Sequence, residues 1–183
     1  MSNSGMKTFK IFLIIICLAV SPVVMAQRVA VKTNLLLDGV LAPNFGFELV
    51  TGKATSLSVS MLSFEKCLGN DLKAIVMQPE FRYWYSKQPM SRGYLGLIGL
   101  AGFYKGDFGV DTFDGYGGGA GVSFGYVFNL TKRLNLELST GFGAFYYHQK
   151  KYWSDREPDG LIPEKGYMMI PFQAGVSIAY VIM

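Results

Sequence analysis

The stretch Gly119-Ala120-Gly121-Val122-Ser123-Phe124-Gly125-Tyr126-Val127-Phe128 alternates two kinds of side chain along the chain. Every second residue from Val122 to Phe128 is large and apolar, and the residues between them up to Gly125 are Ser or Gly. A period of two is typical of a β-strand whose two faces meet different surroundings. This segment is therefore predicted to be a strand with one apolar face and one face of small side chains.

The same pattern extends in both directions and leaves little room for a helix. The predicted strands are 29–37, 44–50, 56–62, 75–85, 94–104, 119–128, 134–147 and 168–182, of which 94–104 is too apolar and Gly-rich for its faces to be assigned. Connections 38–43, 65–73, 105–118 and 148–167 are generally longer than 51–55, 86–93 and 129–133. Short turns at one rim, longer loops at the other and an even strand count are typical of outer-membrane barrels. The predicted fold is all-β, an eight-stranded antiparallel up-and-down transmembrane β-barrel.

The composition of the two faces predicts which side points inward. The polar faces are dominated by Ser and Gly, whereas a surface in water normally carries more charge. Small residues suit the narrow lumen of an eight-stranded barrel, and an apolar exterior suits lipid. Aromatic residues near strand ends favour a membrane boundary; they are 81, 83–85, 103–104 and 145–147. The alternative is a soluble periplasmic, lipocalin-like barrel that carries a hydrophobic ligand.

Five charged residues fall on the polar faces: Lys32, Glu48, Glu80, Arg82 and Glu137. Glu80 and Arg82 are two residues apart, so their side chains project in the same direction. Because buried charges normally pair, we interpret the five as a structural ion network that fills the lumen. The functional alternative is a gate or a proton-sensitive pore. A pair of carboxylates could also serve a hydrolase, but no sugar cleft is evident.

The N-terminus predicts export from the cytoplasm. Basic Lys7 and Lys10 precede the apolar run 11–20, and Val24-Met25-Ala26 is typical of a signal-peptide cleavage site. The apolar run is too short to span a bilayer as a helix. We therefore expect residues 1–26 to be a removed signal peptide and 27–183 to form a single barrel domain in the outer membrane of a Gram-negative cell. Outer-membrane lipid is then the expected partner.

The chemistry available elsewhere in the chain is sparse, so no catalytic residue, metal site or cofactor is assigned. Without Lys7 and Lys10 the charges nearly balance, and no basic cluster with interleaved aromatic residues predicts nucleic-acid binding. Cys67 is the one cysteine outside the predicted signal peptide, so it can form no intramolecular disulfide there. His148, with Ser154 and Asp155 nearby, is the basis of an alternative hypothesis, an outer-membrane enzyme.

The connection from about His148 to Gly166 is predicted to be the longest outward loop and a contact surface for an envelope protein or surface ligand. Tyr152 and Trp153 are its contact candidates, because their rings combine a large area with a polar group. Pro79 and Pro171 fall inside predicted strands, where each removes a backbone donor, and we expect local bulges there.

Three segments carry a resemblance to a known family: residues 32–36 (KTNLL), 43–48 (PNFGFE) and 78–84 (QPEFRYW). Together with the Gly-rich run 117–121 and Gly125-Tyr126, they resemble the DUF3575 family, and the likeness covers most of the chain after the signal. This resemblance implies an outer-membrane β-barrel of Bacteroidetes-type bacteria without an assigned activity. The expected function is a structural or binding role.

Overall fold

The computed structural model describes residues 28–64, 71–107, 111–153 and 162–182. These residues form eight strands and one short helix. In chain order they are β1 (Val29–Asn34), α2 (Leu35–Gly39), β2 (Asn44–Val50), β3 (Thr55–Phe64), β4 (Asp71–Trp84), β5 (Arg92–Asp107), β6 (Asp111–Asn129), β7 (Leu134–Trp153) and β8 (Ile162–Ile182). The expected signal peptide lies outside the described residues.

The strands follow one another around a single antiparallel sheet, which confirms the predicted up-and-down order. The sheet closes into a barrel because β1 pairs with β8 as well as with β2, with Val29 opposite both Ile182 and Leu49. Closure matters because it provides each strand with two neighbours and leaves no continuous free edge along the closed part of the sheet.

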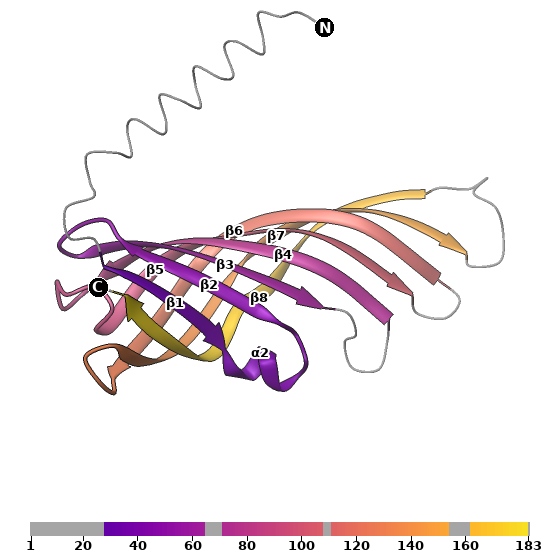
Figure 1. Ribbon diagram of the computed structural model, residues 1–183. Coiled ribbons are helices and arrows are strands. Elements are labelled where there is room, and N and C mark those ends of the chain that lie inside the picture. Colours follow the sequence, from indigo (N-terminus) through magenta and orange to yellow (C-terminus); the bar gives the residue numbers. More distant parts are fainter. Residues whose placement is uncertain (1–27, 65–70, 108–110, 154–161, 183) are drawn as a thin grey trace, which may run out of the picture.

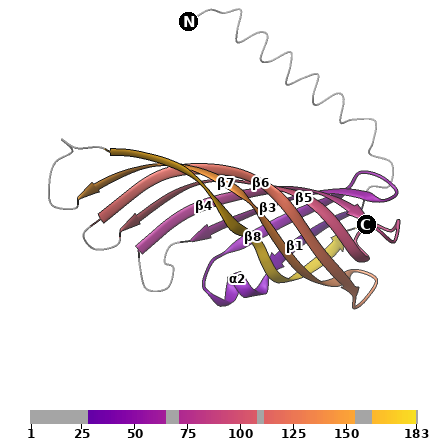
Figure 2. The same ribbon diagram turned by 180° about the vertical axis from the view of Figure 1, so that it is seen from behind.

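The barrel wall differs in height around its circumference. Strands β1, β2 and β3 have 6, 7 and 10 residues, whereas β4 to β8 have 14 to 21. Figures 1 and 2 show the long strands extending well past α2, away from the end where β1 begins and β8 finishes. Turns 51–54, 85–91 and 130–133 lie at the end where β1 begins and β8 finishes, which we call the short-turn end.

Several predicted strand boundaries were wrong. Residues 35–37 belong to α2 and not to the first strand, because the side chain of Asn34 accepts a hydrogen bond from the Leu36 N–H at 3.1 Å and caps the helix. Strands β6, β7 and β8 also extend further than their alternation indicated, so His148–Trp153 and Ile162–Gly166 are strand residues. The remaining part of the predicted loop, 154–161, lies outside the described residues.

The two prolines behave differently from each other. Pro171 lies beside a register shift between β7 and β8, at Gly141 and Phe142, as expected of a bulge. At Pro79 the prediction of a bulge was wrong: the pairing of β4 with β5 lapses between Met77 and Glu80 and then resumes in the same register. The missing donor is accommodated there without an inserted residue.

The burial of side chains follows the period of two. Inward-facing positions hold small, polar and charged side chains together with a few large apolar ones, and outward-facing positions hold mostly large apolar side chains. Exposed examples from all parts of the wall are Phe45, Phe47, Leu57, Met61, Ile75, Phe81, Leu97, Val122, Phe124, Leu138 and Phe142. Trp84 and Phe145, which sequence alone groups with the strand-end rings, point inward and are buried. Within the described ranges, no helix has the length and apolar character required to cross a bilayer.

Candidate functional site: a charged cluster in the lumen

The structure brings all five predicted charged residues together inside the barrel. Lys32 comes from β1, Glu48 from β2, Glu80 and Arg82 from β4, and Glu137 from β7. Each is at most 7% exposed, and Arg82 is fully buried. The five converge because each occupies an inward-facing position in its strand. We call them the lumen cluster.

Arg82 is the centre of the lumen cluster and uses its whole guanidinium group. Nε and Nη2 donate to Glu80 Oε2 at 2.9 and 2.6 Å, and Nη1 donates to Glu48 Oε2 at 2.8 Å. Nη1 and Nη2 donate to the two carboxylate oxygens of Glu137 at 3.0 and 2.8 Å. The bonds to Glu137 form the parallel, bidentate arrangement that makes arginine–carboxylate pairs strong. A guanidinium has five N–H donors, so none remains for a further ligand.

Neutral side chains complete the hydrogen bonds of the carboxylates. Ser56 donates to Glu48 at 2.6 Å and accepts from the indole N–H of Trp84 at 2.8 Å. The Tyr94 hydroxyl donates to Glu137 at 2.8 Å, and Ser123 donates to Glu80. The Arg82 guanidinium also lies over the Tyr94 ring, 4.2 Å from its centroid, a cation–π geometry. These contacts fix the rotamers of the cluster.

Lys32 is the loosely held member of the lumen cluster. Its Nζ lies 3.7 Å from Glu48 and 3.8 Å from Glu137, and it makes no hydrogen bond with any described residue. Lys32 also lines a small polar cavity of about 30 Å³ on the side toward α2, together with Asn34, Asn44, Gln78 and Gln173. Lys32 therefore contributes charge at a distance, whereas Arg82 is held by direct bonds.

Aromatic and apolar layers close the lumen on both sides of the cluster. Toward the short-turn end, Trp84 and Tyr94 pack with Val127. Toward the opposite end of the barrel, where the long strands β4 to β8 extend, Ile98 packs with Phe145 and Phe172. The charged groups therefore lie in a desolvated layer between apolar ones, where unpaired charge would be costly.

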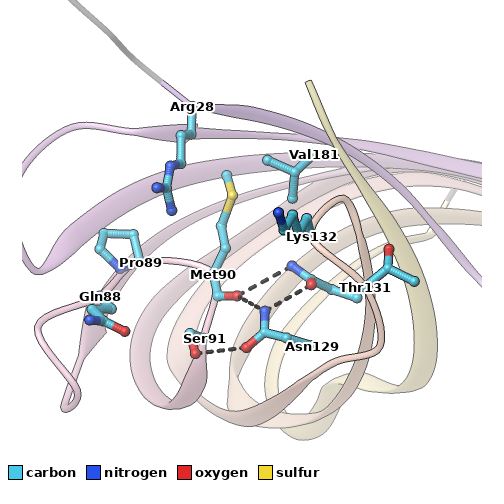
Figure 3. A pocket seen from close by; sticks show the side chains of 10 residues that line it. Arg28, Gln88, Pro89, Met90, Ser91, Asn129, Thr131, Lys132 and Val181 are labelled. Atoms are coloured by element: carbon cyan, nitrogen blue, oxygen red, sulfur yellow. Dashed lines mark hydrogen bonds between the residues drawn. The ribbon is translucent and has the colours of Figure 1, made fainter. Parts of the chain in front are cut away.

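The turn 85–91 covers the mouth of the lumen at the short-turn end. Met90 is buried there against Ala30 and Val181, and its carbonyl accepts hydrogen bonds from the amides of Asn129 and Asn135 at 3.0 and 3.2 Å (Figure 3). A hollow of about 370 Å³ remains beside Met90, and exposed Arg28 and Lys132 are among its lining residues. Met90 thus acts as a plug of the mouth.

The turn that contains Met90 has an unusual backbone conformation. Lys87, Met90 and Arg92 have φ values of 52°, 63° and 64°, in the left-handed region that non-glycine residues seldom adopt. Ser86 stabilises this path, because its hydroxyl donates to the Ser91 carbonyl at 2.9 Å and accepts from the Gln88 N–H at 3.3 Å. Strain of this kind persists only where surrounding contacts impose it.

Sequence reasoning missed several members of the site. Tyr94 was not assigned because both faces of 94–104 are apolar or glycine, and Met90 lies in a turn that has no periodicity. Ser56 and Ser123 did carry a signal, since both lie on predicted polar faces. Among the described residues, no group of three or more His, Cys, Asp or Glu side chains could hold a metal ion.

The remaining candidates lie away from the lumen cluster. His148 is on β7, with its ring 5.4 Å from that of Tyr116 on β6; Ser154 and Asp155 lie outside the described residues. Tyr152 and Trp153 end β7, opposite Thr112 and Asp111 of β6. The structure describes their backbone only and so does not test their contact role.

A family model described as a protein of unknown function, DUF3575, matches residues 11–182. The chain belongs to the DUF3575 family. The match covers the described barrel and every member of the lumen cluster, and it confirms the resemblance found in the sequence. No curated protein and no solved structure matches this DUF3575 chain. The arrangement of the site is therefore the basis for any functional proposal.

Proposed function

We propose that this DUF3575 protein is an outer-membrane β-barrel with a closed lumen and a structural or binding role. One observation carries the proposal: large apolar side chains cover the outside of the barrel, whereas a cluster of charged and polar side chains is buried inside it. A soluble protein of this size normally does the reverse. Fully burying one Leu or Phe side chain stabilises by about 1.5–3 kcal/mol, so a wall of them in water would favour aggregation.

Two rows of exposed rings support a membrane position for the apolar belt. Toward the short-turn end the rings are Tyr83, Tyr85, Tyr126, Phe128 and Tyr180, and toward the other end they are Phe103, Tyr116 and Tyr167. Aromatic girdles of this kind flank the lipid-facing band of outer-membrane barrels. Closure of the sheet is also required there, because lipid offers no partner to free backbone groups.

The lumen cluster supports a structural role in preference to transport. Arg82 is fully buried and uses all its donors within the cluster, and apolar side chains pack on both sides of it. Binding would then be a property of the surface. The proposed contact region for an envelope protein or surface ligand is Tyr152 and Trp153 with the connection that follows them, because their rings combine a large area with a polar group.

The alternatives have weaker support. A soluble lipocalin-like carrier needs an apolar cavity, whereas the layer at the centre of this lumen is charged and filled. An enzyme built on His148 needs a nucleophile and a partner within hydrogen-bond reach, and the described side chain that lies beside the His148 ring is the ring of Tyr116.

The proposal is tested by separating outer membrane, inner membrane and soluble fractions and then comparing the gel mobility of unheated and boiled samples. We expect the protein in the outer-membrane fraction and a mobility that changes on boiling, because closed barrels resist detergent until heated. N-terminal sequencing of the same band should begin at Gln27. A soluble protein whose mobility does not change on heating would exclude the membrane barrel and favour the carrier.

A further inference from the structure

Among the described residues, the exposed charged side chains at the short-turn end of the barrel are all positive. Six exposed cations lie there, which we call the basic rim: Arg28, Lys53, Lys87, Arg92, Lys132 and Arg133. Within the described residues of this end (28–29, 51–55, 85–93, 129–134 and 180–182) there is no Asp or Glu. At the opposite end, exposed Lys73, Lys105 and Lys165 are interspersed with Asp38 and Asp114.

The basic rim surrounds the barrel. It has one member before β1, one between β2 and β3, two around the β4–β5 turn and two between β6 and β7. Because the strands follow chain order around the barrel, these positions are spread over its circumference. None of the six forms an ion pair with another described residue; the ion pairs of the described part all lie in the lumen cluster.

Neighbouring aromatic residues indicate where the basic rim lies along the barrel axis. Arg133 Nη1 lies 3.4 Å from the hydroxyl of Tyr180, a ring of the girdle at the short-turn end. Arg92 begins β5 directly before Gly93, which pairs with Tyr126 of the same girdle. The cations therefore lie just past the apolar belt, at the level where bilayer headgroups begin.

We propose that the basic rim binds the phosphates of anionic phospholipids in the leaflet at the short-turn end. The inference rests on the proposed membrane function, which places that end in the periplasmic leaflet, since the short turns of such barrels face the periplasm. A ring of cations matches a headgroup layer, which also surrounds the barrel, whereas a single acidic protein would need one continuous patch. Long Lys and Arg stems can carry their charges from the apolar belt into this layer.

The test measures the lipid selectivity of the full-length protein purified in detergent and reconstituted into vesicles. Spin-labelled phosphatidylglycerol is compared with spin-labelled phosphatidylcholine at low and high salt. We expect the wild type to prefer phosphatidylglycerol at low salt, with a preference that declines as salt screens the charges. One cation near an anionic surface supplies about a fivefold change in association, equivalent to about 1 kcal/mol.

A rim variant with Lys53→Gln, Lys87→Gln and Lys132→Gln removes one cation from each turn. We expect its preference for phosphatidylglycerol over phosphatidylcholine to be at least fivefold weaker than that of the wild type. The matched control is Lys73→Gln, Lys105→Gln and Lys165→Gln, which removes the same charge from exposed positions at the other end. The control should keep the selectivity of the wild type.

The outcomes separate this inference from the proposed function. Failure to enter vesicles or to change mobility on heating would overturn the membrane barrel itself. A heat-modifiable barrel that enters vesicles but shows no phosphatidylglycerol preference would overturn the rim proposal alone, as would an equal loss in both triple variants. If the rim binds a polyglutamate peptide but shows no lipid selectivity, its ligand is an acidic protein. If millimolar inorganic phosphate at constant ionic strength suppresses the lipid selectivity, its ligand is the free anion.

Discussion

At the scale of single residues, Arg82 balances three carboxylates in a layer without solvent access. Replacement by Gln leaves Glu48, Glu80 and Glu137 facing one another with Lys32 as the nearby cation. We expect Arg82→Gln to lower the free energy of unfolding by about 3–5 kcal/mol, because it leaves buried charge uncompensated. Urea unfolding of the reconstituted protein, followed by tryptophan fluorescence, measures the change.

A second substitution distinguishes charge imbalance from simple loss of packing. Adding Glu137→Gln to Arg82→Gln removes one of the uncompensated carboxylates, so the double variant should be more stable than Arg82→Gln alone. The exposed Arg133→Gln is the control, and a surface change of this type costs within about 0.5 kcal/mol. An Arg82→Gln protein as stable as the wild type would mean that the cluster is solvated.

At the scale of elements, β6 shows how its glycines make room for the lumen cluster. A methyl group on Gly125 would collide with the ring of Tyr94, the residue that donates to Glu137 and lies against Arg82. On Gly118 of the same strand, the nearest atom to such a methyl group is the Leu100 carbonyl oxygen at 3.5 Å, an ordinary contact. We expect Gly125→Ala to destabilise by about 1–3 kcal/mol through overpacking and Gly118→Ala to have little effect in the same urea assay. Equal effects of the two substitutions would contradict this role for Gly125.

The alternation of side chains within single strands also explains which parts of the fold and site could be predicted from the sequence. Glu48, Glu80, Arg82 and Glu137 were assigned to one lumen because each lies on the polar face of an alternating strand, and the period of two is a local property. The alternation weakens in 111–118, where Gly and Asp interrupt it, so the beginning of β6 was interpreted as a loop. Met90 could not be placed from sequence, because its position depends on a left-handed backbone imposed by contacts from β1, β6, β7 and β8.

At the scale of the whole molecule, the lumen is blocked three times in series. Met90 packs with Ala30 and Val181 at the mouth. The lumen cluster with Trp84 and Tyr94 comes next, and the layer of Ile98, Phe145 and Phe172 follows. Side chains fill the interior of eight-stranded barrels, so a continuous water path is not expected.

We therefore expect the protein to produce no discrete conductance steps in a planar lipid bilayer, in contrast to a porin measured under the same conditions. Met90→Ala should also be silent, because it removes one obstruction and leaves two in series. Folded protein must be verified in each recording by the heat-dependent gel mobility of the same preparation, so that silence is not attributed to failed insertion. Reproducible steps in the wild type would overturn the closed lumen and favour the gated-pore interpretation of the charged cluster. Steps in Met90→Ala alone would instead identify the β4–β5 turn as the gate, since the two inner layers would then have been shown to pass ions.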